Sequence, residues 1–222
     1  MPVGFFVTGT DTNIGKTLVS CSLIHAFAKT GRSVVGMKPI AAGCENGRWL
    51  DVDQLSAAST RQFDCAVINP YRLTAPVVPQ IAAHYEAIDI DIAVIEQAFQ
   101  TVRKTVDIVV VEGVGGFVVP LTSQTDTSDL AVALNLPIIM VVGLRLGCLN
   151  HALLTAEAIR ARRLLLAGWV ANTVDPQMDD IAGNIQILKH RLKCPLIGIL
   201  PYNPDINASV FADLLNINPL LT

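Results

Sequence analysis

Short apolar runs alternate with stretches of helical spacing along almost the whole chain. The apolar runs have strand length and are bounded by glycine, proline or a charged residue, as at 108–111 and 137–144. Strands buried on both faces of a parallel sheet have continuous apolar sequences of this kind. The alternation therefore predicts an α/β fold with right-handed crossovers, in which helices cover both faces of a mostly parallel central sheet. We expect strands at residues 3–8, 33–37, 107–111, 137–142, 165–171 and 195–200, and helices at 16–29, 52–58, 91–104, 127–134, 151–163 and 179–192.

The composition narrows the class of protein. The 222 residues are 51% hydrophobic, which favours one domain over residues 1–222 with one sizeable core. The mean hydropathy of +0.48 is high, but no apolar run reaches the roughly 18 residues that a membrane-spanning helix needs. The formal net charge is −3 and no block of lysine and arginine occurs, which argues against a nucleic-acid surface. We therefore expect neither a membrane nor a nucleic acid as a partner.

The first residues and the cysteines indicate the cellular compartment of the protein. The first residues enter a predicted strand without a basic region or a cleavage-site pattern, so we predict no signal peptide. The chain has five cysteines, which are odd in number, scattered, and without a C-x-x-C pair. Such cysteines are typical of reduced thiols rather than of disulfides or zinc ligands. These features favour a cytoplasmic protein.

The segment Gly9-Thr-Asp-Thr-Asn-Ile-Gly-Lys-Thr17 lies between a predicted strand and a predicted helix. Glycines allow main-chain N–H groups to turn toward a phosphate, and the helix N-terminus adds partial positive charge. Lys16 can reach the β- and γ-phosphates, and the Thr17 hydroxyl can bind Mg²⁺. The usual pattern would place its first glycine at Thr10, whereas Gly9 stands one residue earlier. We interpret the segment as the phosphate loop of a P-loop NTPase-like fold rather than as an ordinary helix-capping turn.

Charged residues follow two other predicted strands. Glu112 ends an apolar strand, and a buried carboxylate there needs a partner such as Mg²⁺, although a helix cap or a salt bridge would also explain it. Lys38 ends the second strand before Pro39, where a cation would stabilise charge during phosphoryl transfer; the alternative is a surface lysine. Asp53 opens a predicted helix, and from the pattern alone it is more often an N-cap than a metal ligand.

Five motifs in unbroken order carry a resemblance to a known family. They are Gly-Thr-Asp-Thr-x-x-Gly-Lys-Thr at 9–17, Gly-x-Lys-Pro at 36–39, Val-Glu-Gly-x-Gly-Gly at 111–116, Leu-Gly-Cys-Leu-Asn-His-Ala at 146–152 and Gly-Trp-Val-Ala-Asn at 168–172. Together they resemble the dethiobiotin synthetase family over nearly the whole chain. The first three are partly shared with related ATP-using amide-forming enzymes, whereas the last two are far more specific.

The resemblance implies a reaction in biotin biosynthesis with 7,8-diaminopelargonic acid, CO₂ and ATP as substrates and Mg²⁺ as the metal. One amine captures CO₂ as a carbamate, and a carbamate oxygen attacks the γ-phosphate to give a carbamic–phosphoric anhydride. The second amine then closes a cyclic urea and expels phosphate. The family also implies a homodimer with the substrate near the interface.

The resemblance also implies roles for individual residues, each at the position that matches a family motif. The implied catalytic residues are Lys16, Lys38 and Thr12. The implied nucleotide contacts are Gly9, Thr10, Asp11, Asn13, Ile14, Gly15, Lys16, Thr17, Glu112, Asn172 and Pro201. The implied Mg²⁺ ligands are Thr17, Asp53 and Glu112. The implied substrate contacts are Thr12, Lys38, Gly115, Gly116, Gly147 and Asn150.

The chain departs from the family pattern at three positions. Ala42 stands where the family commonly has a hydroxyl residue, and Asn13 stands where it commonly has an acid. A substrate-binding tyrosine of the late helix has no clear counterpart, and an ungapped comparison puts Asn184 there. We expect slower turnover or a shifted substrate preference, not a different reaction.

Three alternative functions were compared with the sequence, and each lacks support from it. A cobyrinate-type synthetase usually carries a glutaminase domain, for which this chain is too short. A partitioning or cell-division-site ATPase has a second lysine early in the phosphate loop and a basic C-terminal helix, but residues 9–13 and 211–222 supply neither. A catalytically decayed nucleotide-binding protein would be expected to lose Lys16, Thr17 and Lys38, which are all present.

Overall fold

A six-stranded sheet forms the centre of the protein in the computed structural model, which describes residues 4–203 and 207–221. The strand order is β2-β5-β1-β6-β7-β8, and every neighbouring pair is parallel. The strands are β1 (Gly4–Gly9), β2 (Val34–Met37), β5 (Ile108–Glu112), β6 (Ile138–Leu144), β7 (Leu166–Thr173) and β8 (Leu196–Leu200). These strands confirm the parallel α/β prediction; residue 3 of the first predicted strand lies outside the described residues.

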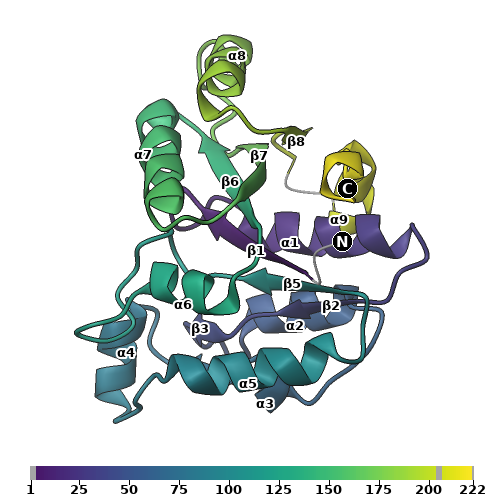
Figure 1. The fold of residues 1–222 in the computed structure, drawn as a ribbon. Helices are drawn as coiled ribbons and strands as arrows, with labels where there is room; N and C mark the ends of the chain where they lie inside the picture. The colour runs from purple at the N-terminus through teal and green to yellow at the C-terminus, as the bar shows by residue number, and fades with distance from the viewer. Residues whose placement is uncertain (1–3, 204–206, 222) are drawn as a thin grey trace.

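Helices cover both faces of this sheet and enclose two hydrophobic cores (Figure 1). In β1, Phe5 and Val7 face one core and Phe6 faces the other, because successive strand residues point to opposite faces. Helices α1 (Lys16–Ala28) and α9 (Ala208–Phe211) lie on the first face. The second face is covered by α5 (Ile92–Arg103), α6 (Thr127–Leu134), α7 (Cys148–Ala161) and α8 (Ile181–Leu192). Every residue of β1, β5 and β6 is buried, which explains their continuous apolar sequences.

A small subdomain follows β2, and of its elements only the helix at 52–58 was predicted from the sequence. It contains the parallel strands β3 (Ile40–Ala42) and β4 (Tyr71–Leu73), with α2 (Leu50–Ala58), α3 (Cys65–Ile68) and α4 (Pro79–Tyr85) around them. Elements this short give no measurable periodicity in the sequence. The subdomain matters because it starts directly after Lys38 and carries α2 toward the phosphate loop.

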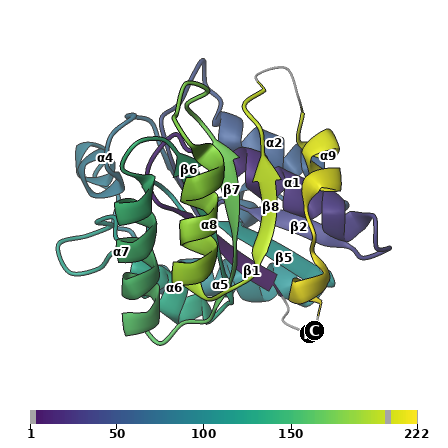
Figure 2. The same cartoon turned by 90° about the horizontal axis from the view of Figure 1, so that it is seen from above.

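Segments that are not regular strands bind both outer edges of the six-stranded sheet. On β8, Gly198 forms an isolated antiparallel bridge with Leu215, next to the short helices η1 (Ala212–Leu214) and η2 (Asn218–Leu220). Figure 2 shows this C-terminal segment, in yellow, alongside β8 and α1. On β2, Thr60 donates its N–H to Val34 O at 2.9 Å and accepts the Val34 N–H at 2.7 Å through its hydroxyl. In the part of the chain that the structure describes, no helix is long and apolar enough to cross a membrane.

Candidate active site

The carboxyl ends of three neighbouring strands bring the phosphate loop, Lys38 and Glu112 together. Strand β5 lies between β1 and β2, and Glu112 is in register with Val7 of β1. Glu112 therefore lies beside the start of the phosphate loop on one side and beside Lys38, directly after β2, on the other. Ligands bind at this edge in open parallel sheets, at the carboxyl ends of the strands.

Hydrogen bonds to neighbouring strands hold the phosphate loop in place, and no side chain caps the helix that follows it. Gly15, the N-cap of α1, has a left-handed backbone with φ of 84°, and no side chain caps the helix there. The first N–H groups of α1 are thus free of a capping side chain, as an anion site requires. The Asn172 side chain donates a 2.8 Å hydrogen bond to Ile14 O, and the Ile14 side chain is buried. The N–H of Thr10 donates to Val141 O of β6, so it supports the loop rather than facing a phosphate.

Lys16 lies within this loop. Its ammonium donates to Asp11 O at 2.9 Å, and its side chain is buried. Burial, together with the positive charge of Lys38, lowers the pKa of Lys16 to about 8, although Glu112 and Asp51 act in the opposite direction. A bound polyphosphate would supply the negative charge that this buried ammonium needs.

Lys38 is the centre of a buried charge cluster. Its Nζ lies 2.5 Å from Glu112 Oε1, 3.1 Å from Asp51 Oδ2 and 3.1 Å from Gly113 O. The Thr17 hydroxyl donates to the same Glu112 oxygen at 2.9 Å. Burial alone would lower the pKa of Lys38, but the charges and hydrogen bonds of Glu112 and Asp51 outweigh it and raise the pKa above its ordinary value of 10.5. Lys38 is therefore a fixed cation and not the exposed surface lysine of the alternative interpretation.

The oxygens around Thr17 fit a magnesium ion. Glu112 is fully buried, and its Oε2 has no hydrogen-bond partner among the described residues. Mg²⁺ prefers carboxylate and hydroxyl oxygens together with phosphate oxygens and water. No group of three or more His, Cys, Asp or Glu side chains suited to a metal occurs in residues 4–203 and 207–221. A metal here would bind the carboxylates of Glu112 and Asp51 and the hydroxyl of Thr17, and would take its remaining ligands from the nucleotide and water.

The carboxylate of α2 that contacts Lys38 is Asp51, whereas Asp53, the predicted metal ligand, contacts Arg48. Asp53 Oδ2 lies 2.7 Å from Arg48 Nε in an exposed ion pair. Helix α2 begins at Leu50, so both acids lie in its first turn. Residues two apart on a helix point in nearly opposite directions, so only one of them can face Lys38. Burial alone would raise the pKa of Asp51, but Lys38 holds it below its ordinary value of 3.8.

The glycine turn after Glu112 lies against the phosphate loop. A Cβ atom added to Gly115 would lie 3.6 Å from the Thr12 hydroxyl, and one added to Gly116 would lie 3.7 Å from Gly9 O. The structure therefore brings together Thr12 and both glycines, which were predicted as substrate contacts.

Gly147 and Asn150 are exposed at the start of α7, in a part of the chain distant in sequence from the phosphate loop. Arg145 connects the two regions, since its guanidinium pairs with the Asp11 carboxylate in the phosphate loop. Arg145 was not predicted as a site residue. Gly147 and Asn150 as substrate contacts remain predictions.

Cavities flank the phosphate loop on two sides, and Asn13 lines both. A cavity of about 250 Å³ contains Asn172, Pro201 and Tyr202, so the predicted base-reading residues lie together. A cavity of about 360 Å³ contains Ala42, Glu45 and Asp51, on the side of Lys38. The loop thus separates the cavity at Asn172 from the cavity near the charge cluster.

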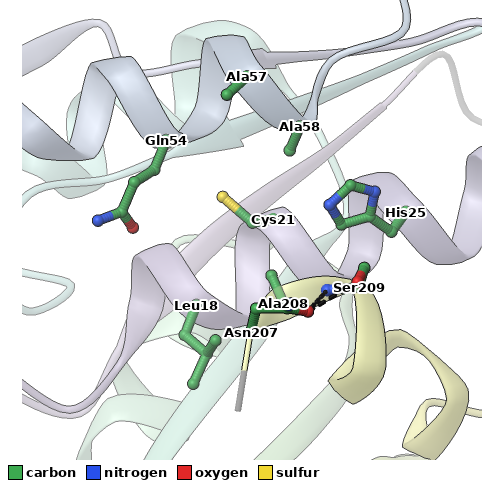
Figure 3. A pocket seen from close by; sticks show the side chains of 9 residues that line it. All are labelled: Leu18, Cys21, His25, Gln54, Ala57, Ala58, Asn207, Ala208 and Ser209. Carbon is green, nitrogen blue, oxygen red and sulfur yellow. Dashed lines mark hydrogen bonds between the residues drawn. The ribbon is translucent and has the colours of Figure 1, made fainter. Parts of the chain in front are cut away.

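A larger cavity of about 530 Å³ lies between α1, α2 and α9, and neither Lys16 nor Lys38 lines it (Figure 3). Cys21 and His25 of α1 line it together with Gln54 of α2. Burial raises the pKa of Cys21 to about 12, with smaller contributions from Glu112 and Asp51. A thiol with this pKa stays protonated at neutral pH, so Cys21 is not an activated nucleophile.

Comparison with known proteins agrees with the fold and with the phosphate loop. The AAA domain family matches residues 3–210. Among solved structures, the chain is similar to the MinD cell division protein of Aquifex aeolicus, with a TM-score of 0.58 and 16% identity over 95% of this chain and 84% of that one. It is also similar to a ParA family ATPase from Chlorobium tepidum, with a TM-score of 0.55 and 11% identity over 94% and 91% of the two chains. These likenesses define a P-loop NTPase fold.

The similarity in sequence is much closer to biosynthetic enzymes. The chain is 55% identical over 217 residues to the ATP-dependent dethiobiotin synthetase BioD of Nitrosospira multiformis, covering 98% of this chain and 96% of the relative. It is 53% identical over 205 residues to the enzyme of the same name from Aromatoleum aromaticum, covering 90% and 91% of the two chains. The chain belongs to the dethiobiotin synthetase family and is an ATP-dependent ligase of biotin biosynthesis. The resemblance drawn from the motifs is thereby confirmed.

Proposed function

We propose that this enzyme forms the cyclic urea of dethiobiotin from 7,8-diaminopelargonic acid, CO₂ and ATP, with Mg²⁺ as the metal. The observation that carries the proposal is the cluster in which Lys38 joins Glu112 and Asp51 beside the phosphate loop. A fixed cation beside a polyphosphate site is suited to neutralise negative charge on a γ-phosphate and on an attacking carbamate.

The chemistry divides between the substrates and the side chains that position them. One substrate amine adds to CO₂ and loses a proton, which gives a carbamate. A carbamate oxygen then attacks the γ-phosphorus and ADP leaves, so that a carbamic–phosphoric anhydride forms. The second amine attacks the carbamate carbon and expels phosphate. Lys16 and the loop N–H groups would hold the β- and γ-phosphates, while Lys38 would neutralise the charge that develops between carbamate and phosphate.

Side chains around Lys38 would also hold the metal. Thr17, Glu112 and Asp51 would hold Mg²⁺, which when bound supplies positive charge to the phosphate oxygens. The unpartnered Glu112 Oε2 supports this assignment. Thr12 would contact the diamine or the carbamate, since it lies beside Gly115 in the turn after β5.

Two separate regions beside the loop suit the two ends of such a complex. The cavity with Asn172 and Pro201 would take the purine base. On the other side, the turn at Gly115 and Gly116 and the start of α7, at Gly147 and Asn150, would bind the substrate tail.

We also propose a homodimer that uses the face near α7. Leu146 is 94% exposed just before α7, and Leu154 on α7 is 56% exposed, so this face offers apolar side chains to a partner. Both lie close in sequence to the proposed tail contacts Gly147 and Asn150, so a partner on this face would help to enclose the substrate tail.

The test of the reaction is a phosphate-release assay with purified protein, ATP, Mg²⁺ and bicarbonate, with and without 7,8-diaminopelargonic acid. We expect release that depends on the diamine, a product with the mass of the cyclic urea, and strong loss of rate in Lys16→Ala and Lys38→Ala. Release that is indifferent to the diamine, or no release from folded protein, would contradict the proposed reaction and leave the ATP-binding fold standing.

A further inference from the structure

The main chain of Lys38 is fixed by a segment that lies about thirty residues further along the sequence. The Lys38 N–H donates to Ile68 O at 2.9 Å, and the N–H of Tyr71 donates to Pro39 O at 3.0 Å. Between these two bonds, the Asn69 side chain donates through Nδ2 to Lys38 O at 2.5 Å and to Tyr71 O at 3.2 Å. Asn69 therefore joins the two sides of this turn.

Asn69 is fully buried, and its Oδ1 has no hydrogen-bond partner among the described residues. A buried amide oxygen without a partner destabilises a fold, and an apolar side chain of similar shape would avoid that cost. The two donations through Nδ2 are thus what asparagine contributes here that an apolar residue would not. One of those donations goes to the main-chain carbonyl of Lys38.

The position of this carbonyl affects where the lysine ammonium lies. Lys38 has a long flexible side chain, yet its Nζ must stay within hydrogen-bond distance of Glu112, Asp51 and Gly113 O. The next residue is proline, which has no N–H to donate. The Lys38 N–H already donates to Ile68 O and Pro39 has no N–H, so the Lys38 carbonyl is the main-chain group to which the Asn69 side chain donates.

We propose that Asn69 is a positioning residue for the reaction: it holds the main chain at Lys38 so that the ammonium is aligned with the substrates in the transition state. This inference rests on the proposed function, because it assigns Lys38 its part in that reaction. A loss of alignment lowers the rate of the chemical step more than the affinity for ATP, since Lys16 and the phosphate loop bind the nucleotide independently.

Two variants of similar shape test the donor directly. Asn69→Leu removes the donor, and Asn69→Asp replaces it with an acceptor that faces two carbonyl oxygens. For both, we expect kcat of diamine-dependent phosphate release to fall by about tenfold or more, while the KM for ATP changes by less than about threefold. The matched control is Val102→Ala in the buried core of α5, which lowers the melting temperature and leaves kcat near the wild-type value.

A second pair keeps the test decisive if these variants do not fold. Asn69→Ser and Asn69→Ala both leave a small cavity, but only serine keeps a hydroxyl donor. We expect a higher kcat for Asn69→Ser than for Asn69→Ala at comparable melting temperatures. Equal kcat values in this pair, or a folded Asn69→Leu with wild-type kcat, would overturn the proposal. The wild-type assay decides the reaction separately, because its failure would not depend on any Asn69 variant.

Discussion

Replacing Asp51 with asparagine would remove one carboxylate from the cluster around Lys38 and keep the shape of the side chain. Asp51 Oδ2 lies 3.1 Å from Lys38 Nζ, and its side chain is 50% exposed. Asp53, two residues later on α2, pairs with Arg48 and provides a matched control. The two variants carry the same change in net charge and lie in the same helical turn.

The expected size of the effect follows from these environments. A hydrogen bond to a charged group contributes about 1.5–3 kcal/mol, and solvent at a half-exposed side chain reduces this to about 1–2 kcal/mol. Asp51→Asn should therefore raise the Mg²⁺ concentration for half-maximal rate about 5- to 30-fold. Asp53→Asn breaks only an exposed ion pair and should change that concentration less than about twofold.

The assay is a Mg²⁺ titration of diamine-dependent phosphate release at saturating ATP, with the melting temperature of each variant as a check on folding. The reasoning would be refuted if Asp53→Asn raised the Mg²⁺ concentration for half-maximal rate as much as Asp51→Asn did. It would equally be refuted if Asp51→Asn had wild-type Mg²⁺ dependence.

Three further predictions concern the loop, the departure at Ala42 and acid stability. Gly15→Ala should weaken ATP binding at least about tenfold in a titration, because the new Cβ would lie 2.3 Å from Asn172 Nδ2 at a φ of 84°. The control Gly31→Ala has a similar φ of 81° but open space around the new Cβ, so it should leave ATP binding unchanged. Ala42→Ser restores the hydroxyl that the family commonly has and should raise kcat or lower the KM for the diamine, and unchanged constants would show that Ala42 has no influence. The hydroxyl and N–H of Ser33 donate to Asp107 and hold the pKa of that carboxyl below its ordinary 3.8. These hydrogen bonds therefore stabilise the folded protein above pH 3.8, and the stabilisation is lost as the pH falls through the lowered folded-state pKa. The melting temperature of Ser33→Ala should thus lie below wild type at pH 6, and the gap should narrow at pH 3.

The central sheet could be predicted because burial on both faces leaves a clear mark on the sequence. Runs such as Ile108–Glu112 are apolar at nearly every position, and their polar ends coincide with the site. Glu112 and Lys38 were found because a charge after such a run is conspicuous. The strands Ile40–Ala42 and Tyr71–Leu73 have three residues each, too few for any periodicity to appear.

The remaining site residues depend on information that local patterns do not hold. The resemblance implied Asp53 as a metal ligand at the start of a helix expected from residue 52, whereas α2 begins at Leu50 and Asp51 is the acid that contacts Lys38. Helix boundaries carry the largest error in such predictions. Arg145 and Asn69 act on Asp11 and Lys38 through contacts between distant parts of the chain. Asn69 lies outside every motif, and Arg145 stands directly before the motif at 146–152 without belonging to it.

The bonded edges of the central sheet limit how this protein can associate with other chains. Exposed edge strands are templates onto which further strands add, as in fibril growth. Here Leu215 already occupies part of the β8 edge and Thr60 part of the β2 edge. A second copy would therefore not add a strand at these positions, which agrees with the proposed interface near α7. A truncation that ended before Leu215 would uncover β8, and we expect such a shortened chain to precipitate by strand addition even where its ATP site stays intact.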